Sequence, residues 1–292
     1  MDFTISAYKK LLESLISAGY SFVTFKEYIE SQAKPGCSSF VILRHDVDRL
    51  PENSLRTSLI ENSLGIKGTY YFRIVPESYD EEIIREISKL GHEIGYHYED
   101  VDLANKQLKI KNSKFLPEAD QPPAKKIKNM PAIRQDFTFN EGTLIDLSYE
   151  SFCKNLDRIK NIADVKTICM HGSPLSKFDN KIIWGKYNYK NLGLIGEPYL
   201  DLNWNEFGYL TDTGRKWNGE DVSVRDKVNS KYKFKFKSTI DIINNIDRLP
   251  ARVMFTVHPQ RWNDNMFSWV NELALQSIKN AIKKLLLVKR NT

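Results

Sequence analysis

Short apolar segments alternate with amphipathic segments along most of this chain, and this alternation restricts its fold more than any other feature. Residues 39–47 form a nearly continuous apolar run, which is typical of a strand buried on both faces. Residues 6–18 instead repeat their apolar side chains with the period of a helix. Strands that alternate with helices predict an α/β fold with a parallel sheet, open or closed, and helices outside it.

The predicted elements follow one another through most of the chain. Helices are expected over 6–18, 54–64, 79–90, 148–162, 238–248 and 266–287. Strands are expected over 39–47, 68–75, 92–98, 166–171, 192–202, 207–211, 231–237 and 251–257. Because no repeat and no clear domain boundary interrupts this order, residues 1–292 are expected to form a single domain.

A lysine-rich stretch at about 103–145 breaks the pattern. Its segment 106–128 contains seven lysines but only two acidic residues, Glu118 and Asp120. We interpret the stretch as a solvated basic insertion or lid, because long segments of this kind inside a domain are usually lids, binding loops or insertions. The alternative is an arm that recruits an anionic glycan, lipid headgroup or nucleotide.

Composition argues against several classes of protein. The 43 Lys and Arg residues exceed the 37 Asp and Glu residues by six, which is not the profile of a dedicated nucleic-acid binder. No segment approaches the roughly 18 to 20 apolar residues that span a bilayer. The widely spaced cysteines, which favour reduced thiols, are Cys37, Cys153 and Cys169. With an N-terminus that lacks signal-peptide character, these features predict a cytoplasmic protein without a membrane span.

All five histidines lie at or near the ends of apolar runs. Parallel α/β folds build their active sites at the carboxyl ends of their strands. His97, His171 and His258 each stand at such an end and are therefore candidate functional residues. His45 and His92 are expected to face elsewhere, because successive side chains of a strand point to opposite faces.

Residues 44–48 read RHDVD, and the same strand alternation places Arg44, Asp46 and Asp48 on one face. Two carboxylates at this spacing repel each other unless a cation or a shared proton relieves the charge. A divalent metal on one carboxylate would do so and leave the other free as a general base. The alternative is a structural ion pair with Arg44.

These motifs resemble the polysaccharide deacetylase family, also called the NodB-homology domain. RHDVD (44–48) is similar to the family's first motif, an aspartate base followed by an aspartate metal ligand, and GHEIGYH (91–97) to the run that leads to its first metal-binding histidine. Further similar segments are GTYYF (68–72), GYLTDTGRKW (208–217) and VHP (257–259). The resemblance covers roughly residues 38–102 and 205–262. The RHDVD form most resembles a branch linked to bacterial surface-polysaccharide synthesis.

The chain departs from the family's pattern at two positions. Val47 separates two aspartates that are usually adjacent, and Val101 stands where the second metal-binding histidine usually lies. The candidates for the missing ligand are His171, Glu99 and Asp102. We favour His171, since it comes from another strand end and imidazole suits zinc-like metals.

The resemblance implies a distorted (β/α) barrel of about seven parallel strands with outer helices. It also implies a hydrolase that removes an N- or O-acetyl group from a carbohydrate or sugar nucleotide. One divalent metal, expected to be zinc, would be bound by Asp48, His97 and His171. Asp46 would act as the general base, and His258 would donate a proton to the leaving group.

Supporting roles are assigned to residues near these motifs. Arg44 or Arg134 would keep the base ionised and oriented. Asp212 would orient the proton donor or bind sugar, and Trp217 or Trp262 would stack on a sugar or pack in the interior. Two other functions stay open: hydrolysis of another non-peptide C–N bond on the same fold, and a catalytically inactive glycan-binding homologue.

Overall fold

A computed structural model of the chain describes residues 1–31, 39–114, 141–172, 176–217 and 228–291, with side chains except at 111–114 and 284–291. Its strands are β1 Ser21–Val23, β2 Phe40–Val47, β3 Thr69–Phe72, β4 Glu93–Tyr98, β5 Ile168–Met170, β6 Gly208–Thr211 and β7 Arg252–Val257. They form one sheet in the order β5-β4-β3-β2-β7-β6, with β1 beside the start of β2. Every pairing is parallel.

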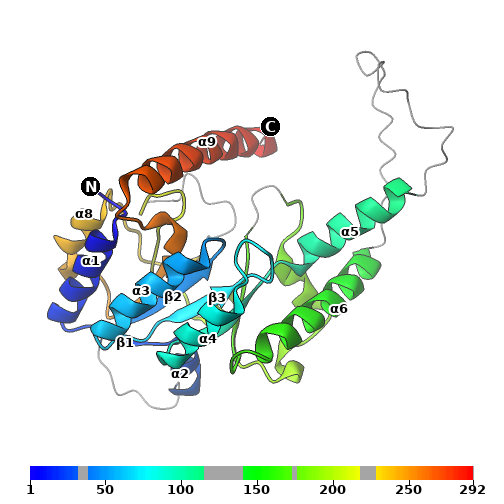
Figure 1. Ribbon diagram of the computed structural model, residues 1–292, viewed down its shortest axis with the longest axis horizontal. Helices are drawn as coiled ribbons and strands as arrows, with labels where there is room; N and C mark the ends of the chain where they lie inside the picture. Colours follow the sequence, from blue (N-terminus) through cyan, green and yellow to red (C-terminus); the bar gives the residue numbers. More distant parts are fainter. Residues whose placement is uncertain (32–38, 115–140, 173–175, 218–227, 292) are drawn as a thin grey trace.

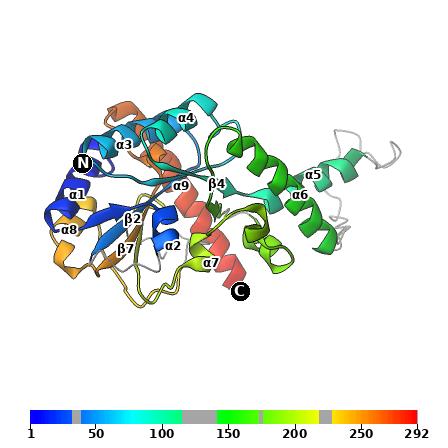
Figure 2. The same cartoon turned by 90° about the horizontal axis from the view of Figure 1, so that it is seen from below.

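The sheet curls into a half-barrel with helices outside it (Figure 1, Figure 2). Among the described residues, the two outer strands β5 and β6 do not pair with each other, so the barrel stays open. The expected distorted barrel of about seven parallel strands with outer helices is therefore confirmed.

β2 lies at the centre of the sheet, and each of its residues is buried. Its first half is apolar because both faces of a central parallel strand are covered. Its second half carries Arg44, which lies opposite Thr256 near the end of β7, and Asp46, which lies opposite Tyr71 near the end of β3. His97 in β4 lies opposite Cys169 in β5. Because all the strands run the same way, the residues at their carboxyl ends meet at one edge of the sheet.

The helices are α1 Ile5–Ser17, α2 Phe25–Ser31, α3 Pro51–Ser63, α4 Glu81–Lys89, α5 Asp100–Lys114, α6 Glu141–Lys160, α7 Pro198–Asp201, α8 Thr239–Ile243 and α9 Met266–Asn291. Short 3-10 helices are η2 Asn180–Gly185, η3 Tyr189–Leu192, η5 Ile246–Arg248 and η6 Pro259–Arg261. Several of these helices have a side-chain cap at their first turn. In α1, for example, the Thr4 hydroxyl accepts a hydrogen bond from the Ala7 N–H. None of the helices among the described residues is long and apolar enough to cross a membrane.

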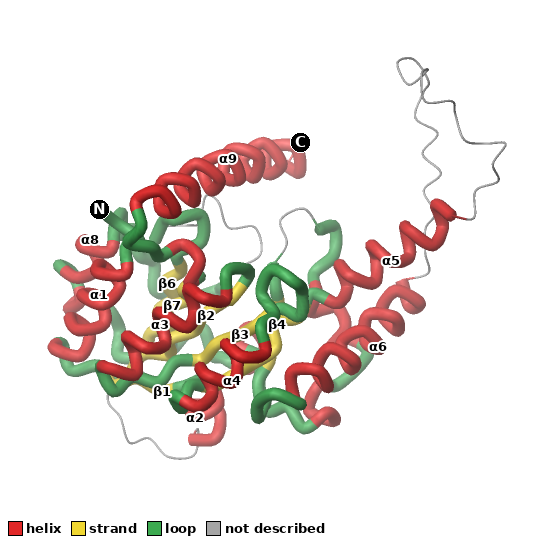
Figure 3. Tube along the Cα trace, in the orientation of Figure 1, coloured by secondary structure: helices red, strands yellow, loops and turns green. Residues whose placement is uncertain are grey.

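Two large apolar clusters hold the helices against the sheet. One joins α1 and α8 to β2 and β7 and includes Leu11 and Ile242. The other joins α4 and α6 to β3 and β4 and includes Ile84 and Phe152. α9 lies along the top of the molecule in Figure 1, whereas α5 and α6 pack side by side at the right of Figure 3. The carboxyl edge of the sheet lies beneath α9, and the candidate site lies between the two.

One of the predicted strands is wrong, and another is reduced to a single bridge. Residues 231–237 form no strand, although Phe234 and Phe236 do pack on the core with their rings stacked 5.4 Å apart. The alternation of Lys with aromatic residues reports one buried face, which an extended segment can have without pairing to a sheet. Residues 192–202 form a single parallel bridge, from Gly196 to Thr167, instead of a full strand. α7 begins directly after it, where the Glu197 carboxylate accepts from the Leu200 N–H.

The lysine-rich stretch at 103–145 is partly helical rather than irregular. α5 continues to Lys114 and α6 begins at Glu141, while residues 115–140 lie outside the described part of the chain. Val101, Ala104 and Leu108 pack on one side of α5 against α6 and η2. This i, i+3, i+7 spacing was present in the sequence, but the lysines at 106, 109, 111 and 114 obscured it.

Candidate metal centre and cavity

Asp48, His97 and His171 converge at the carboxyl edge of the sheet, where each follows or ends a different strand. One ligand atom from each lies within 4.8 Å of the others. Asp48 Oδ1 is 3.2 Å from His171 Nδ1 and 3.7 Å from His97 Nε2. The two ring nitrogens are 3.2 Å apart. The structure thus brings together the residues that the sequence analysis assigned to a metal.

The chemistry of these donors fits a divalent metal. His97 Nδ1 lies 3.0 Å from the backbone oxygen of Cys169, so its N–H donates there and the lone pair of Nε2 faces Asp48 and His171. Asp48 Oδ1 is buried, and its only close polar neighbours among the described residues are the two imidazoles. A buried oxygen of this kind calls for an explanation, and a cation is one. Two imidazoles and one carboxylate match the ligands of catalytic zinc sites.

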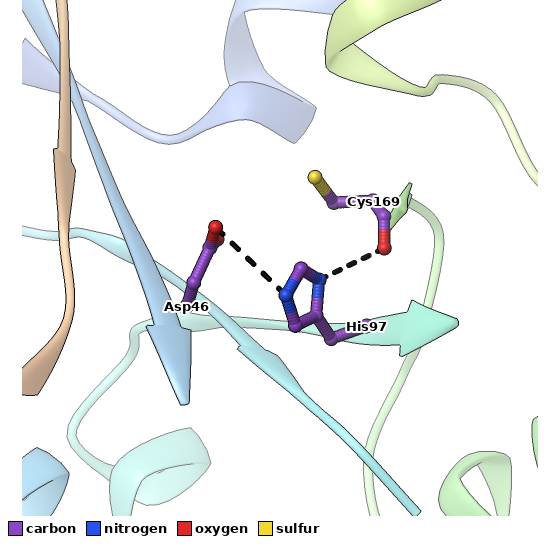
Figure 4. A group of neighbouring side chains, drawn as sticks. All are labelled: Asp46, His97 and Cys169. Atoms are coloured by element: carbon purple, nitrogen blue, oxygen red, sulfur yellow. Dashed lines mark hydrogen bonds and ion pairs between the residues drawn. The ribbon is translucent and has the colours of Figure 1, made fainter. Parts of the chain in front are cut away.

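A second set of residues shares His97 and also could hold a metal: Asp46, His97 and Cys169, drawn in Figure 4. His97 Nε2 lies 3.8 Å from Asp46 Oδ2. The two oxygens of Asp46, however, accept from Arg44 Nε at 2.8 Å and Nη2 at 2.6 Å. In the described part of the chain, no guanidinium pairs with both oxygens of Asp48 in this way, so the Asp48 carboxylate is more available to a metal.

The lowered pKa values of Asp48 and His97 suit metal binding, whereas His171 has a raised pKa and would release its proton when a metal binds. Burial lowers the pKa of His97 to about 4, so its ring is neutral near pH 7 and has a lone pair to offer. Burial opposes ionisation of Asp48, but His171, His258 and His97 outweigh it and bring the pKa of this carboxyl well below its usual value. Burial of His171 is likewise outweighed by the neighbouring Asp48, which raises the pKa of the imidazole.

Asp46 is held as a carboxylate at the same edge of the sheet. Its burial favours the neutral acid, but the guanidinium of Arg44 overcomes this effect and lowers the pKa of Asp46 to about 2. The Arg44 side chain is itself fully buried, and it stacks its guanidinium 4.9 Å from the ring of Tyr199. The predicted role of Arg44 in keeping Asp46 ionised and oriented has a direct geometric basis, whereas Arg134 lies outside the described residues.

His258 and Asp212 form a buried pair next to the candidate metal ligands. His258 Nδ1 lies 2.6 Å from Asp212 Oδ1, and the backbone N–H of His258 donates to Asp212 Oδ2 at 3.0 Å. Arg261 Nη1 and Trp262 Nε1 also donate to this carboxylate, at 2.6 and 2.8 Å. Asp212 therefore fixes the ring of His258 so that Nε2 faces Asp48, with 3.9 Å between Nε2 and Oδ2.

Asp46, Asp48, His97, His171 and His258 line a cavity of about 410 Å³. Its floor is the carboxyl edge of the sheet, and its wall includes Gln260, whose amide nitrogen donates to Asp48 Oδ2 at 3.2 Å. The side chains that α9 contributes are Glu272, Gln276, Lys279, Ile282 and Lys283. The volume is in the range of small-molecule sites.

The other predicted site residues lie away from the ligand cluster. Glu99 accepts from Arg73 Nε and Nη2 at 2.9 and 2.6 Å, and Asp102 accepts from an asparagine in η2, so neither is a third ligand. Trp217 and Trp262 are buried in the core and do not line the cavity. Of the two roles expected for these tryptophans, packing is the one that the structure shows.

The two remaining histidines belong to a separate buried cluster on the other face of the sheet. His45 Nε2 is 3.0 Å and His92 Nδ1 3.5 Å from the carboxylate of Glu61. Tyr8 and Tyr70 donate their hydroxyls to Glu61 Oε1 at 2.6 and 2.7 Å. This cluster ties α1 and α3 to the sheet. The strand alternation separated these histidines correctly from the cavity, but nothing in the sequence pointed to Glu61.

The sequence analysis also missed Cys169, Gln260 and Arg261. Cys169 lies opposite His97 in the register of β4 and β5, which a single sequence does not reveal. Gln260 and Arg261 follow His258 in η6, and the Pro259 that opens this turn was the available signal. Comparison of the chain with models of known protein families and with curated proteins gave no match.

Proposed function

We propose that this protein is a metal-dependent hydrolase that removes an acetyl group from a carbohydrate. The observation that carries the proposal is the convergence of Asp48, His97 and His171 beside two further buried groups, Asp46 and His258, in one cavity. Acyl transfer to water requires an electrophile, a base and an acid within reach of one carbonyl group. Asp48, His97 and His171 would hold the electrophilic metal, Asp46 would be the base, and His258 would be the acid.

Zinc is the metal that we propose, held by Asp48, His97 and His171. Two imidazoles with one carboxylate are a ligand set of catalytic zinc enzymes, which keep a further position open. When bound, the ion would supply a Lewis acid that polarises an acyl carbonyl and makes a water molecule more acidic.

The protein's own residues divide the proton transfers between them. Asp46, which Arg44 keeps ionised and oriented, accepts a proton from the attacking water. His258 donates a proton from Nε2 to the departing amine or alkoxide, while Asp212 holds its Nδ1–H. Arg261 and Trp262 fix Asp212 in turn, so the orientation of the acid does not depend on the substrate.

The resemblance of residues 44–48, 91–97 and 257–259 to motifs of polysaccharide deacetylases supports a carbohydrate or sugar nucleotide as the substrate. The same resemblance favours a role in the synthesis of a bacterial surface polysaccharide. The cavity of about 410 Å³ is large enough for one or two sugar residues at its floor.

Acetate release from N- and O-acetylated oligosaccharides and sugar nucleotides tests the proposal. We expect release by the zinc-loaded protein, its loss in Asp48→Asn, and its loss on chelation with recovery when zinc is restored. A zinc-loaded protein that releases no acetate from any of these substrates but cleaves small cyclic amides would instead support hydrolysis of another C–N bond. Zinc binding without either activity would contradict the hydrolase assignment.

A further inference from the structure

α9 turns its polar side toward the protein. Glu272 and Gln276 are buried on that side, and Glu272 pairs with Arg49 at the start of α3. One turn further, the Asn280 amide donates to the backbone oxygen of Gly214 at 2.9 Å. The contacts that hold the helix in place are therefore polar along the face that lines the cavity.

The outward side of α9 is apolar, which reverses the usual arrangement of a surface helix. Phe267 is 82% exposed and Ile278 is 60% exposed. The other exposed apolar residues of the helix are Met266, Val270, Leu273, Leu275 and Ile282. A continuous apolar face of this kind on a protein surface marks a place where another apolar phase is bound.

The charge of α9 indicates what binds there. Its sequence contains five basic residues, Lys279, Lys283, Lys284, Lys289 and Arg290, of which Lys279 and Lys283 also line the cavity. Its one acidic residue, Glu272, is already paired with Arg49. A second copy of the chain packed along α9 would bring the same excess of basic residues and be repelled, whereas an anionic lipid surface would be attracted.

A groove beside the first turns of α9 points to the same partner. It has a volume of about 340 Å³ and is lined by Leu50 and Arg56 of the α3 region and by Phe267 and Leu275 of α9. Arg56 is exposed and forms no ion pair with the residues that the structure describes, so its charge is available. A cation between exposed apolar side chains suits a phospholipid, because the cation can contact the phosphate while the apolar side chains contact the acyl chains below it.

We infer that α9 and this groove dock the protein on the surface of an anionic lipid bilayer. Phe267, Ile278 and their apolar neighbours enter the region between the headgroups and the acyl chains, as amphipathic interfacial helices do. The inner face of the same helix lines the cavity of the candidate metal centre, so docking brings that cavity to the lipid surface. The inference concerns binding alone and holds or fails independently of the proposed hydrolase activity.

Co-sedimentation of the full-length protein with lipid vesicles tests this inference. We expect the protein to bind vesicles of phosphatidylcholine with phosphatidylserine, to bind vesicles of phosphatidylcholine alone more weakly, and to dissociate from the former as salt is raised. Arg56→Gln is expected to reduce binding to the anionic vesicles about fivefold, since one basic residue near such a surface contributes about 1 kcal/mol.

The apolar contribution is tested with two double variants that add the same charge. Phe267→Glu with Ile278→Glu should reduce binding about tenfold or more, because two apolar side chains lose their burial in the membrane. Ile16→Glu with Ile240→Glu, at exposed positions on α1 and α8, is the matched control and should bind as the unmodified protein does. All four positions are exposed, so folding should be unaffected, which circular dichroism verifies.

Any of three results would overturn the inference. The first is equal binding by the two double variants, and the second is equal binding to neutral and anionic vesicles. The third is a protein that binds no vesicles and that light scattering shows to be a dimer, which Phe267→Glu with Ile278→Glu converts to a monomer. In that case the apolar face of α9 joins two copies of the protein.

Discussion

His97 Nε2 and His171 Nδ1 lie 3.2 Å apart, although 74 positions separate the two residues in the sequence. The parallel pairing of β4 with β5 produces this proximity, since His97 is opposite Cys169 and His171 follows two residues later. The two rings are nearly perpendicular, with centroids 5.0 Å apart. Asp48 from β2 completes the group. Three strands thus present one ligand atom each to a common point.

Substitution of the two rival ligands should distinguish the two possible metal sets. His171→Ala is expected to weaken zinc binding by more than about 100-fold, because it removes a direct ligand. Cys169→Ser preserves the backbone oxygen that orients His97 and should leave the affinity nearly unchanged. Competition with a chromogenic chelator measures both affinities. The reverse order would assign the metal to Asp46, His97 and Cys169 instead.

Asp46→Asn should separate metal binding from catalysis. The amide is nearly isosteric with the carboxylate, so we expect zinc content to be retained. Without its base, the enzyme should lose about 10²- to 10⁴-fold in kcat for acetate release. Arg44→Lys should lower kcat less than Asp46→Asn does, since lysine keeps the positive charge but not the paired hydrogen bonds of the guanidinium. Unchanged turnover in Asp46→Asn would remove this residue from the mechanism.

His258 and Asp212 should act as one unit in catalysis. His258→Ala and Asp212→Asn are each expected to lower kcat about 10²-fold or more. The double variant should be little worse than the more damaging single one, because Asp212 acts through the ring that it orients. The kcat values of the four proteins form a double-mutant cycle. Additive losses would show that Asp212 contributes independently, for example by binding sugar.

The general fold was predictable because the strands carry strong signals. Residues 40–43 and 253–255 are buried apolar runs within β2 and β7, and the chain order of the strands fits one parallel sheet. The sequence signals failed where a segment has the alternation of a strand but does not form the hydrogen bonds of a sheet. Residues 231–237 have the alternation of a strand but pair with none in the described part of the chain. The lysines of α5 obscured this helix in the sequence, and two of them, Lys106 and Lys109, are exposed.

The candidate site was predictable as far as side chains near strand ends could be recognised. His97, His171 and Asp48 satisfy that condition, and the structure places them together. Strand alternation also separated His45 from them. Glu61 was not predictable, because its role depends on how α3 packs across the sheet, and a helix position carries no signal of its distant partners.

Tyr8→Phe should weaken the fold without disturbing the metal. The change leaves the ring packed but removes a hydroxyl that donates to the buried Glu61 at 2.6 Å. We expect the free energy of unfolding to fall by about 1–3 kcal/mol, as measured by urea denaturation. Zinc affinity should be unchanged, since the cluster around Glu61 and the candidate ligands lie on opposite faces of β2. A parallel loss of zinc affinity would show that the two faces are coupled.

The most direct test of the central claim is anomalous diffraction at the zinc absorption edge from crystals of the zinc-loaded protein. The account predicts one strong peak within bonding distance of Asp48 Oδ1, His97 Nε2 and His171 Nδ1, at about 2.0–2.2 Å from each ligand atom. A peak bonded to Cys169 Sγ, or no peak at the carboxyl edge of the sheet, would contradict it.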